Sequence, residues 1–206
     1  MTVQINYKNS GLKKTSSNFV MFVGENYNID GLKKYIPKIE ISYLKDLLKT
    51  SDIKKKLLVF DISSKKKIIL VSVKKDIKTF EAENLGAELY NSIHLNKKNE
   101  YTVNADTINC KIENFIGHFL HGLKLKSYEF KKYKTKKDTI SISINVIGFK
   151  NKTSFQNQLK FKALEEGTFY ARDLVSEPGN ILHPDEYAKR ISSLKKIGLK
   201  INIYDE

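Results

Sequence analysis

The sequence is poor in the residues on which several protein classes depend. Cys110 is the only cysteine, so no disulfide can form within the chain, and a reducing compartment suits it. No window approaches the roughly 20 apolar residues of a membrane-spanning helix, and the first residues lack the apolar core of a signal peptide. Neither a P-loop nor a G-x-G-x-x-G motif is present. We therefore expect a cytoplasmic protein without these phosphate-binding loops.

Arginine is almost absent as well, although the chain is strongly basic. The net charge is +14, and all 37 basic residues except Arg172 and Arg190 are lysines. Such a charge favours a polyanion-binding surface, but lysine lacks the planar fork that arginine offers to phosphates and base edges. We favour a compositional bias, because tryptophan is missing and Ile, Asn, Tyr and Phe are abundant. The densest runs, interpreted as solvated loops or strand ends, are Lys54–Lys56, Lys65–Lys67 and Lys131–Lys137.

The remaining composition fits a soluble globular protein. Hydrophobic residues make up 40% of the 206 residues and charged residues 29%. This length has room for one domain of roughly 100–150 residues and part of a second. No internal repeat and no low-complexity segment is present.

Apolar patterns predict a mixed α/β domain in residues 1–150. Strands are expected at 18–24, 57–63, 67–73, 100–108 and 139–147, and helices at 42–52, 79–93 and 111–123. The second and third strands, joined by a short lysine-rich turn, should form a hairpin. The last strand has Ile140, Ile142, Ile144 and Val146 on one side and Ser141, Ser143 and Asn145 on a less buried side. A hairpin among interleaved helices indicates a mixed sheet flanked by helices.

Two of these helices have apolar faces at helical spacing. Thr79 is a candidate N-cap of the helix 79–93, and Glu81 and Glu83 suit the positive end of its dipole. The apolar face of this helix consists of Ala82, Leu85, Gly86, Leu89 and Ile93. The stripe of the helix 111–123 consists of Ile112, Phe115, Ile116, Phe119, Leu120 and Leu123.

The pattern changes after residue 150. A long helix is predicted at 155–175, and we interpret residues 151–179 as a connector. The narrow stripe of this helix consists of Leu159, Ala163, Gly167, Tyr170 and Leu174. Pro178 and Gly179 end the connector, and Pro184 suits the first position of a helix to about residue 196. Gly198 then stops that helix before a strand at 200–206, so residues 180–206 form the start of a second α/β unit.

Two stretches of the chain have a distinctive residue order. In "EEGTFYARDLVSEPGNILHPDEYA" the relevant residues are Ala171, Arg172, Asp173, Leu174, Val175, Glu177, Pro178, Asn180 and Pro184. In "HGLKLKSYEFKKYKTKK" they are Gly122, Leu123, Tyr128, Phe130, Tyr133 and Lys134. The two stretches resemble the leucyl (cytosol) aminopeptidase family of metallopeptidases, at its interdomain junction and at the end of its N-terminal domain. The chain departs from the family at Ser176, at His183, and at "LVSVKKD", where a glycine-rich turn is usual.

The resemblance implies a two-domain enzyme, with residues 1–150 as a macro-like domain, 151–179 as the connector and 180–206 as the start of the catalytic domain. In the family, two divalent cations (manganese or zinc) polarise the scissile carbonyl and activate a water that releases the N-terminal residue of a peptide. The family's ligands, a lysine and several acidic residues, would follow Glu206. No residue of this sequence therefore inherits a catalytic, cofactor-binding or metal-binding role, and the chain alone should be inactive. A homo-hexamer is implied for the complete enzyme.

Several side chains with chemical potential have simpler interpretations. His118 and His121 are three residues apart, but the glutamate of H-E-x-x-H is absent and both lie off the apolar stripe, so we expect them in solvent or at a cap. Cys110 has no evident basic neighbour and should be a buried structural thiol. Four further candidates are expected at helix ends, in loops or on helix surfaces, without a chemical role. They are His94, His183, the pair Ser192 and Lys195, and the pair Ser193 and Lys196.

Arg172 and Asp173 are interpreted as a pair that docks the connector helix, and Glu177 as a residue that braces the turn. Two alternatives to the aminopeptidase interpretation remain open. The chain could be a stand-alone module that binds a nucleotide-type ligand or DNA, since a macro-like domain can do the former and the lysine excess favours the latter. It could also be an inactive remnant of an interrupted gene.

Overall fold

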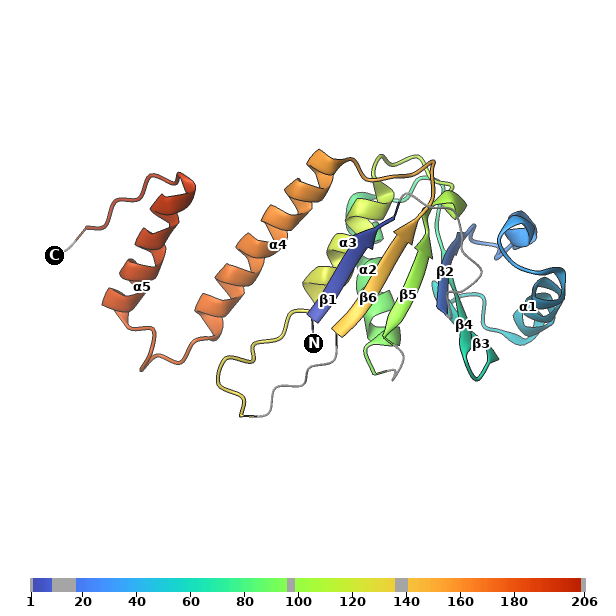
Figure 1. Cartoon of the computed structure of the whole chain (residues 1–206), viewed down its shortest axis with the longest axis horizontal. Helices are drawn as coiled ribbons and strands as arrows, with labels where there is room; N and C mark the ends of the chain where they lie inside the picture. Colours follow the sequence, from blue (N-terminus) through green and yellow to red (C-terminus); the bar gives the residue numbers. More distant parts are fainter. Residues whose placement is uncertain (1, 9–17, 96–98, 136–140, 205–206) are drawn as a thin grey trace. The chain divides into compact units, whose positions relative to one another are not determined.

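The computed structural model describes residues 2–8, 18–95, 99–135 and 141–204. These residues form two compact units, 1–165 and 166–206, which meet within one long helix. The first unit contains all the strands of the described chain and the helices that pack on them (Figure 1).

The first unit is built on a six-stranded mixed sheet. Its strands are β1 (Thr2–Tyr7), β2 (Asn18–Val23), β3 (Leu57–Ser63), β4 (Lys66–Ser72), β5 (Glu100–Asn104) and β6 (Ser141–Ile147). The spatial order is β1-β6-β5-β2-β4-β3, and every neighbouring pair is parallel except β3 and β4. The expected hairpin is therefore confirmed as the antiparallel edge of an otherwise parallel sheet.

Helices cover both faces of this sheet, and each face has its own core. On one face lie α2 (Thr79–Ile93) and α3 (Phe115–Lys126), packed on Val20 and Phe22 of β2. On the other face lie the 3-10 helix η1 (Asp30–Lys34) and α1 (Lys38–Thr50), packed on Phe19 and Met21. All six residues of β2 are buried, as a central strand covered on both faces requires. Figure 1 shows α1 and α2 on opposite sides of β2.

The helices α2 and α3 cross at a distance that only glycine permits. A Cβ atom on Gly86 would lie 1.8 Å from the backbone oxygen of Phe119, and one on Gly122 would lie 1.9 Å from the backbone oxygen of Glu83. Each glycine therefore faces the backbone of the opposite helix. Gly122 belongs to one of the two stretches that resemble the aminopeptidases, and this close approach is a physical reason for glycine there.

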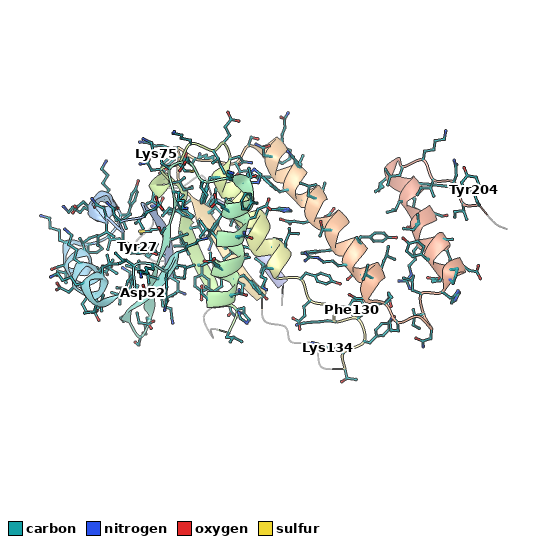
Figure 2. All side chains as sticks on the ribbon, turned by 180° about the vertical axis from the view of Figure 1, so that it is seen from behind. Tyr27, Asp52, Lys75, Phe130, Lys134 and Tyr204 are labelled. Atoms are coloured by element: carbon teal, nitrogen blue, oxygen red, sulfur yellow. The ribbon has the colours of Figure 1, made fainter. Side chains whose placement is uncertain are left out.

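A buried tyrosine connects the loops around α1, and a half-buried lysine ties α1 to the sheet. Tyr27, labelled in Figure 2, is 3% exposed, and its hydroxyl donates to the carbonyl of Lys55 at 2.5 Å. Burial raises the pKa of Tyr27 to about 12, so this hydroxyl keeps its proton. Lys66 reaches Glu40 of α1 at 2.6 Å and lies over the ring of Phe19.

The lysine runs are only partly solvated. Lys54, Lys55 and Lys56 are exposed, as expected. The run 65–67 lies at a strand end, one of the two expected places, because β4 begins at Lys66. Lys66 and Lys67 are half-buried and not solvated, because both side chains pair with acidic residues of neighbouring elements. The last two lysines of the run 131–137 lie outside the described residues.

Two helices start four residues away from the predictions, since α1 begins at Lys38 and not at 42 and α3 at Phe115 and not at 111; the helix α2 begins at Thr79 as predicted, but its N-cap residue differs. Lys78, not Thr79, is the N-cap residue of α2, and its backbone N–H donates to Glu81 at 2.9 Å. The helix α3 begins at Phe115 and not at 111, because Asn114 has a left-handed backbone with φ of 55°. Ile112 therefore precedes the helix, although it still packs against the core.

The strand β6 is confirmed at 141–147, but its polar side is more buried than the alternation predicts. Asn145 is 4% exposed, and its amide donates to Glu100 at 2.7 Å. Ser141 and Ser143 are half-buried, and Ile140 lies outside the described residues. A hydrogen-bonded partner on the neighbouring strand thus allows a polar side chain to be buried there.

The long helix is confirmed as α4 (Phe155–Ser176), and it spans both compact units. The predicted stripe is wrong in its first half: Leu159 and Ala163 are exposed, whereas Phe161 is 7% exposed. In the second unit, α5 (Pro184–Ser192) begins at Pro184 as expected. It continues as the 3-10 helix η3 (Ser193–Ile197), which ends at Gly198 with φ of 92°.

The strand predicted at 200–206 is not formed in its described part. Residues 201–204 have no regular secondary structure, and no described strand is available to pair with them in this unit. A strand needs a hydrogen-bonding neighbour, so the apolar alternation alone was not sufficient.

Candidate functional site

The first half of α4 is anchored to α3 by one aromatic side chain. The ring of Phe161 lies 5.1 Å from the ring of His118 and 5.2 Å from that of His121. Gly117 leaves room for it, since a Cβ atom there would lie 2.5 Å from the Phe161 ring. We call Phe161, His118 and His121 the histidine clamp. It fixes the start of the connector helix on the first unit.

Both histidines of the clamp also face acidic side chains. The Nδ1 atom of His118 lies 3.3 Å from Glu83 of α2, and that of His121 lies 3.7 Å from Glu165 of α4. The His121 and Glu165 side chains are only 8% and 14% exposed. The expectation that these histidines lie in solvent or at a cap is therefore wrong for His121, because α4 covers a side of α3 that its own apolar stripe does not use.

The turn of the second unit is braced by an arginine that the sequence analysis did not single out. Arg190 of α5 donates from Nη1 to Glu177 at 2.8 Å and from Nε to Glu186 at 2.9 Å. The Glu177 side chain is 1% exposed, and the hydroxyl of Tyr170 donates to the Arg190 carbonyl at 2.9 Å. The hydrogen bonds that Arg190 donates to Glu177 and then to Glu186 raise the pKa of Arg190 further above its ordinary value. Arg190 thus connects the end of α4, the turn and α5.

Glu177 braces the turn through Arg190, as predicted. The four-residue spacing of Glu186 and Arg190 predicts an ion pair between these two residues on a helix, but no local pattern predicts that Arg190 also reaches Glu177, 13 residues away. Arg172 and Asp173 are exposed on α4. Their role in docking a further domain stays a prediction.

The other candidate side chains lie where a structural role places them. Cys110 is half-buried against the core, and burial raises the pKa of its thiol, so it carries a proton near neutral pH. His94 follows α2 and stacks on Tyr90 at 5.3 Å. His183 is the N-cap residue of α5 without a side-chain cap, and Ser193 donates to the Arg190 carbonyl.

The stretch after α3 is held together by charges and rings. Glu129 accepts hydrogen bonds from Lys131 and Lys134, which lower the pKa of its carboxyl to about 2. The rings of Phe130 and Tyr133 lie 5.9 Å apart. Phe130 and Lys134 are labelled in Figure 2, and both belong to the second stretch that resembles the aminopeptidases.

Metal-ligating side chains do not gather in the described part of the chain. Among these residues, no group of three or more His, Cys, Asp and Glu side chains could hold a metal ion. No helix among them is long and apolar enough to cross a membrane.

Comparison with known proteins links this fold to one class of enzyme. No family model matches the chain. A probable cytosol aminopeptidase of Methylorubrum populi is 37% identical over 93 residues, which are 44% of this chain and 19% of that protein. A probable cytosol aminopeptidase of Clostridium perfringens is 35% identical over 103 residues, 46% of this chain and 21% of that protein. The chain thus spans about a fifth of the length of the curated relatives that it matches.

Solved structures match nearly the whole chain. A mutant tomato leucine aminopeptidase has a TM-score of 0.68 at 17% identity, over 95% of this chain and 42% of that one. A cytosol aminopeptidase of Coxiella burnetii has a TM-score of 0.64 at 14% identity, over 97% of this chain and 40% of that one. The mixed α/β fold is therefore the one found in leucine aminopeptidases. Together with the sequence relatives, it confirms the resemblance to leucyl aminopeptidases drawn from the two stretches.

Proposed function

We propose that the chain is the N-terminal part of a metal-dependent leucyl aminopeptidase, an enzyme that hydrolyses the N-terminal residue of peptides. The observation that carries this proposal is the 37% identity to a probable cytosol aminopeptidase over 93 residues. The fold supports it, since a leucine aminopeptidase matches 95% of the chain. In this proposal the catalytic residues and metal ligands belong to a part of the enzyme that follows Glu206.

The cofactor proposed for the complete enzyme is a pair of divalent cations, manganese or zinc. A similar structure is the bottromycin maturation enzyme BotP in complex with Mn, which has a TM-score of 0.65 and 12% identity. Two bound cations supply polarisation of the scissile carbonyl and activation of a water. No residue of the present sequence is assigned to bind them.

The proposed domain division is 1–150 for the macro-like domain, 151–179 for the connector and 180–206 for the start of the catalytic domain. The connector role is supported by the histidine clamp at one end of α4 and by the Arg190 brace after its other end. The second unit exposes large apolar side chains, including Val175 at 88%, Ile197 at 74% and Tyr204 at 88%. Such side chains would be covered by the remaining catalytic domain. We extend the proposal to a cytoplasmic homo-hexamer acting on peptides.

An activity assay on the native protein tests this function. The protein would be purified from its own cell with an antibody against residues 18–95, and hydrolysis of leucine p-nitroanilide would be followed. We expect hydrolysis that a chelator abolishes and that added Mn²⁺ or Zn²⁺ restores. The control is the 206-residue chain under the same conditions, which should release no p-nitroaniline. Native protein that hydrolyses no aminoacyl p-nitroanilide with either metal would contradict the proposal.

A further inference from the structure

A cavity of about 300 Å³ opens in the first unit where β2 and β5 end. One wall comes from Val23 at the end of β2 and Gly24 after it, and another from Asp106 to Asn109 after β5. Lys34 and Tyr35 of the η1 region and Lys150 after β6 complete the rim. None of these residues belongs to the histidine clamp or to the Arg190 brace.

The cavity lies at the point of the sheet where the chain reverses its direction of winding. The strands β2 and β5 are parallel neighbours. The chain leaves β2 to form η1 and α1 on one face, and it leaves β5 to form α3 on the other face. In open α/β sheets, a crevice at the carboxyl ends of two such strands is the usual place for a bound ligand. This position alone makes the cavity a candidate site.

One wall of the cavity is a rigid, hydrogen-bonded structure. Asp106 accepts hydrogen bonds at 2.7 Å from the backbone N–H groups of both Phe149 and Lys150. Gly148 precedes them with φ of 129°, and a Cβ atom there would lie 2.9 Å from the Asp106 carboxylate. The loop after β6 is therefore folded onto Asp106. This arrangement fixes the backbone of Lys150 at the rim.

The charge of the cavity suits an anion. Lys34 and Lys150 are exposed on the rim, and among the described residues that line the cavity Asp106 is the only acidic one. Two lysines against one aspartate leave these described lining residues with an excess of positive charge, and two backbone amides already bind one oxygen of the Asp106 carboxylate. Burial and then the nearby Asp106 raise the pKa of Tyr35, so its hydroxyl remains a hydrogen-bond donor at neutral pH.

The volume of the cavity limits the size of the ligand that it can hold. About 300 Å³ is at the lower end of the range for small organic ligands, and it exceeds the space that a bare inorganic anion fills. Lysine ammonium groups are compact point charges that bind phosphate. We propose that this cavity binds a small organic phosphate, with the phosphate group held by Lys34 and Lys150 and the organic part against Tyr35. The proposal concerns the first unit and does not depend on the aminopeptidase assignment.

Calorimetric titration of the 206-residue chain at low ionic strength tests the proposal. The phosphate probes are adenosine monophosphate and ribose 5-phosphate, and adenosine and ribose are their uncharged counterparts. We expect both phosphates to bind and both uncharged compounds to bind at least about tenfold more weakly, since they lose the contacts with the lysines. Adenosine that binds as tightly as its monophosphate would overturn the role of the lysines. Absence of saturable binding by either phosphate would overturn the site.

Two double variants distinguish binding at this cavity from nonspecific electrostatic attraction of phosphates to a basic protein. Lys34→Ala with Lys150→Ala should weaken binding of either phosphate on the order of tenfold. The matched control is Lys33→Ala with Lys38→Ala, which removes the same charge from exposed positions outside the cavity lining and should change the affinity less than about twofold. If both double variants weaken phosphate binding equally, a diffuse polyanion surface binds the phosphates and the proposal is overturned. The same conclusion follows if duplex DNA competes efficiently and both double variants lose the same affinity. Circular dichroism should show that both variants are folded, because all four lysines are exposed.

Discussion

Replacement of Gly122 by alanine should force α2 and α3 apart. The new Cβ atom would lie 1.9 Å from the backbone oxygen of Glu83, whereas ordinary contacts of this kind lie at 3.4–4 Å. The obstacle is backbone, so no side-chain rotation can relieve the overlap. The helices would have to separate by about 1.5 Å, and a gap of that size forfeits a large part of the dispersion energy across the interface.

Two opposing contributions decide how far Gly122→Ala changes the free energy of unfolding. Alanine favours a helix over glycine by about 1 kcal/mol. Overpacking of a core costs about 1–3 kcal/mol, and here backbone separation places the cost at or above the upper end. We therefore expect Gly122→Ala to lower the free energy of unfolding by about 2–3 kcal/mol, or the melting temperature by about 4–12 °C for a unit of this size.

Urea denaturation followed by far-ultraviolet circular dichroism would measure the change. The control is Gly167→Ala, also within a helix, where nothing lies within 4 Å of the added Cβ atom. Gly167→Ala should leave the stability unchanged or raise it by up to about 1 kcal/mol. If Gly122→Ala is as stable as the natural chain, the close crossing of α2 and α3 is wrong.

Three further predictions concern the clamp, the brace and the thiol. Phe161→Ala should lower the free energy of unfolding of the first unit by about 2–4 kcal/mol, since it empties the space between His118 and His121; unchanged amide-exchange protection in the first half of α4 would contradict the clamp. Glu177→Gln should speed amide exchange in α5 more than Glu186→Gln does, because Glu177 is the buried partner of Arg190; equal effects would show that burial does not matter there. Cys110 should react slowly with a disulfide reagent at pH 7 and faster only above its ordinary pKa, because burial raises that pKa and the thiolate is the reactive form; rapid labelling at pH 7 would refute its protonated state.

Elements with a strong local pattern could be predicted from the sequence, whereas the edge strand β1 was not predicted and the strand expected at 200–206 is not formed in its described part. The hairpin 57–72 and the helix 79–93 were defined by apolar periodicity, and both are present as β3–β4 and α2. The buried side of α4 could not be predicted in this way. Its partner is a pair of histidines on α3, so Phe161 is buried and the more regularly spaced Leu159 is exposed.

The candidate sites depend on contacts between residues distant in the sequence. Lys34 and Lys150 meet at one cavity only because β2 and β6 both end at the same edge of the sheet. Asp106 shapes the same cavity through the amides of Phe149 and Lys150. A single sequence has no local signal for these pairings. The contact of Arg190 with Glu186 is different, since its four-residue spacing was visible within α5.

The central claim is that the chain forms the N-terminal part of a larger aminopeptidase. The most direct test is the intact mass of the polypeptide purified from its native cell. We expect more than twice 23.7 kDa, because the chain matches only 42% of the length of a leucine aminopeptidase with the same fold. A mass of 23.7 kDa would contradict the claim, because it would mean that the cell makes this chain without a catalytic domain.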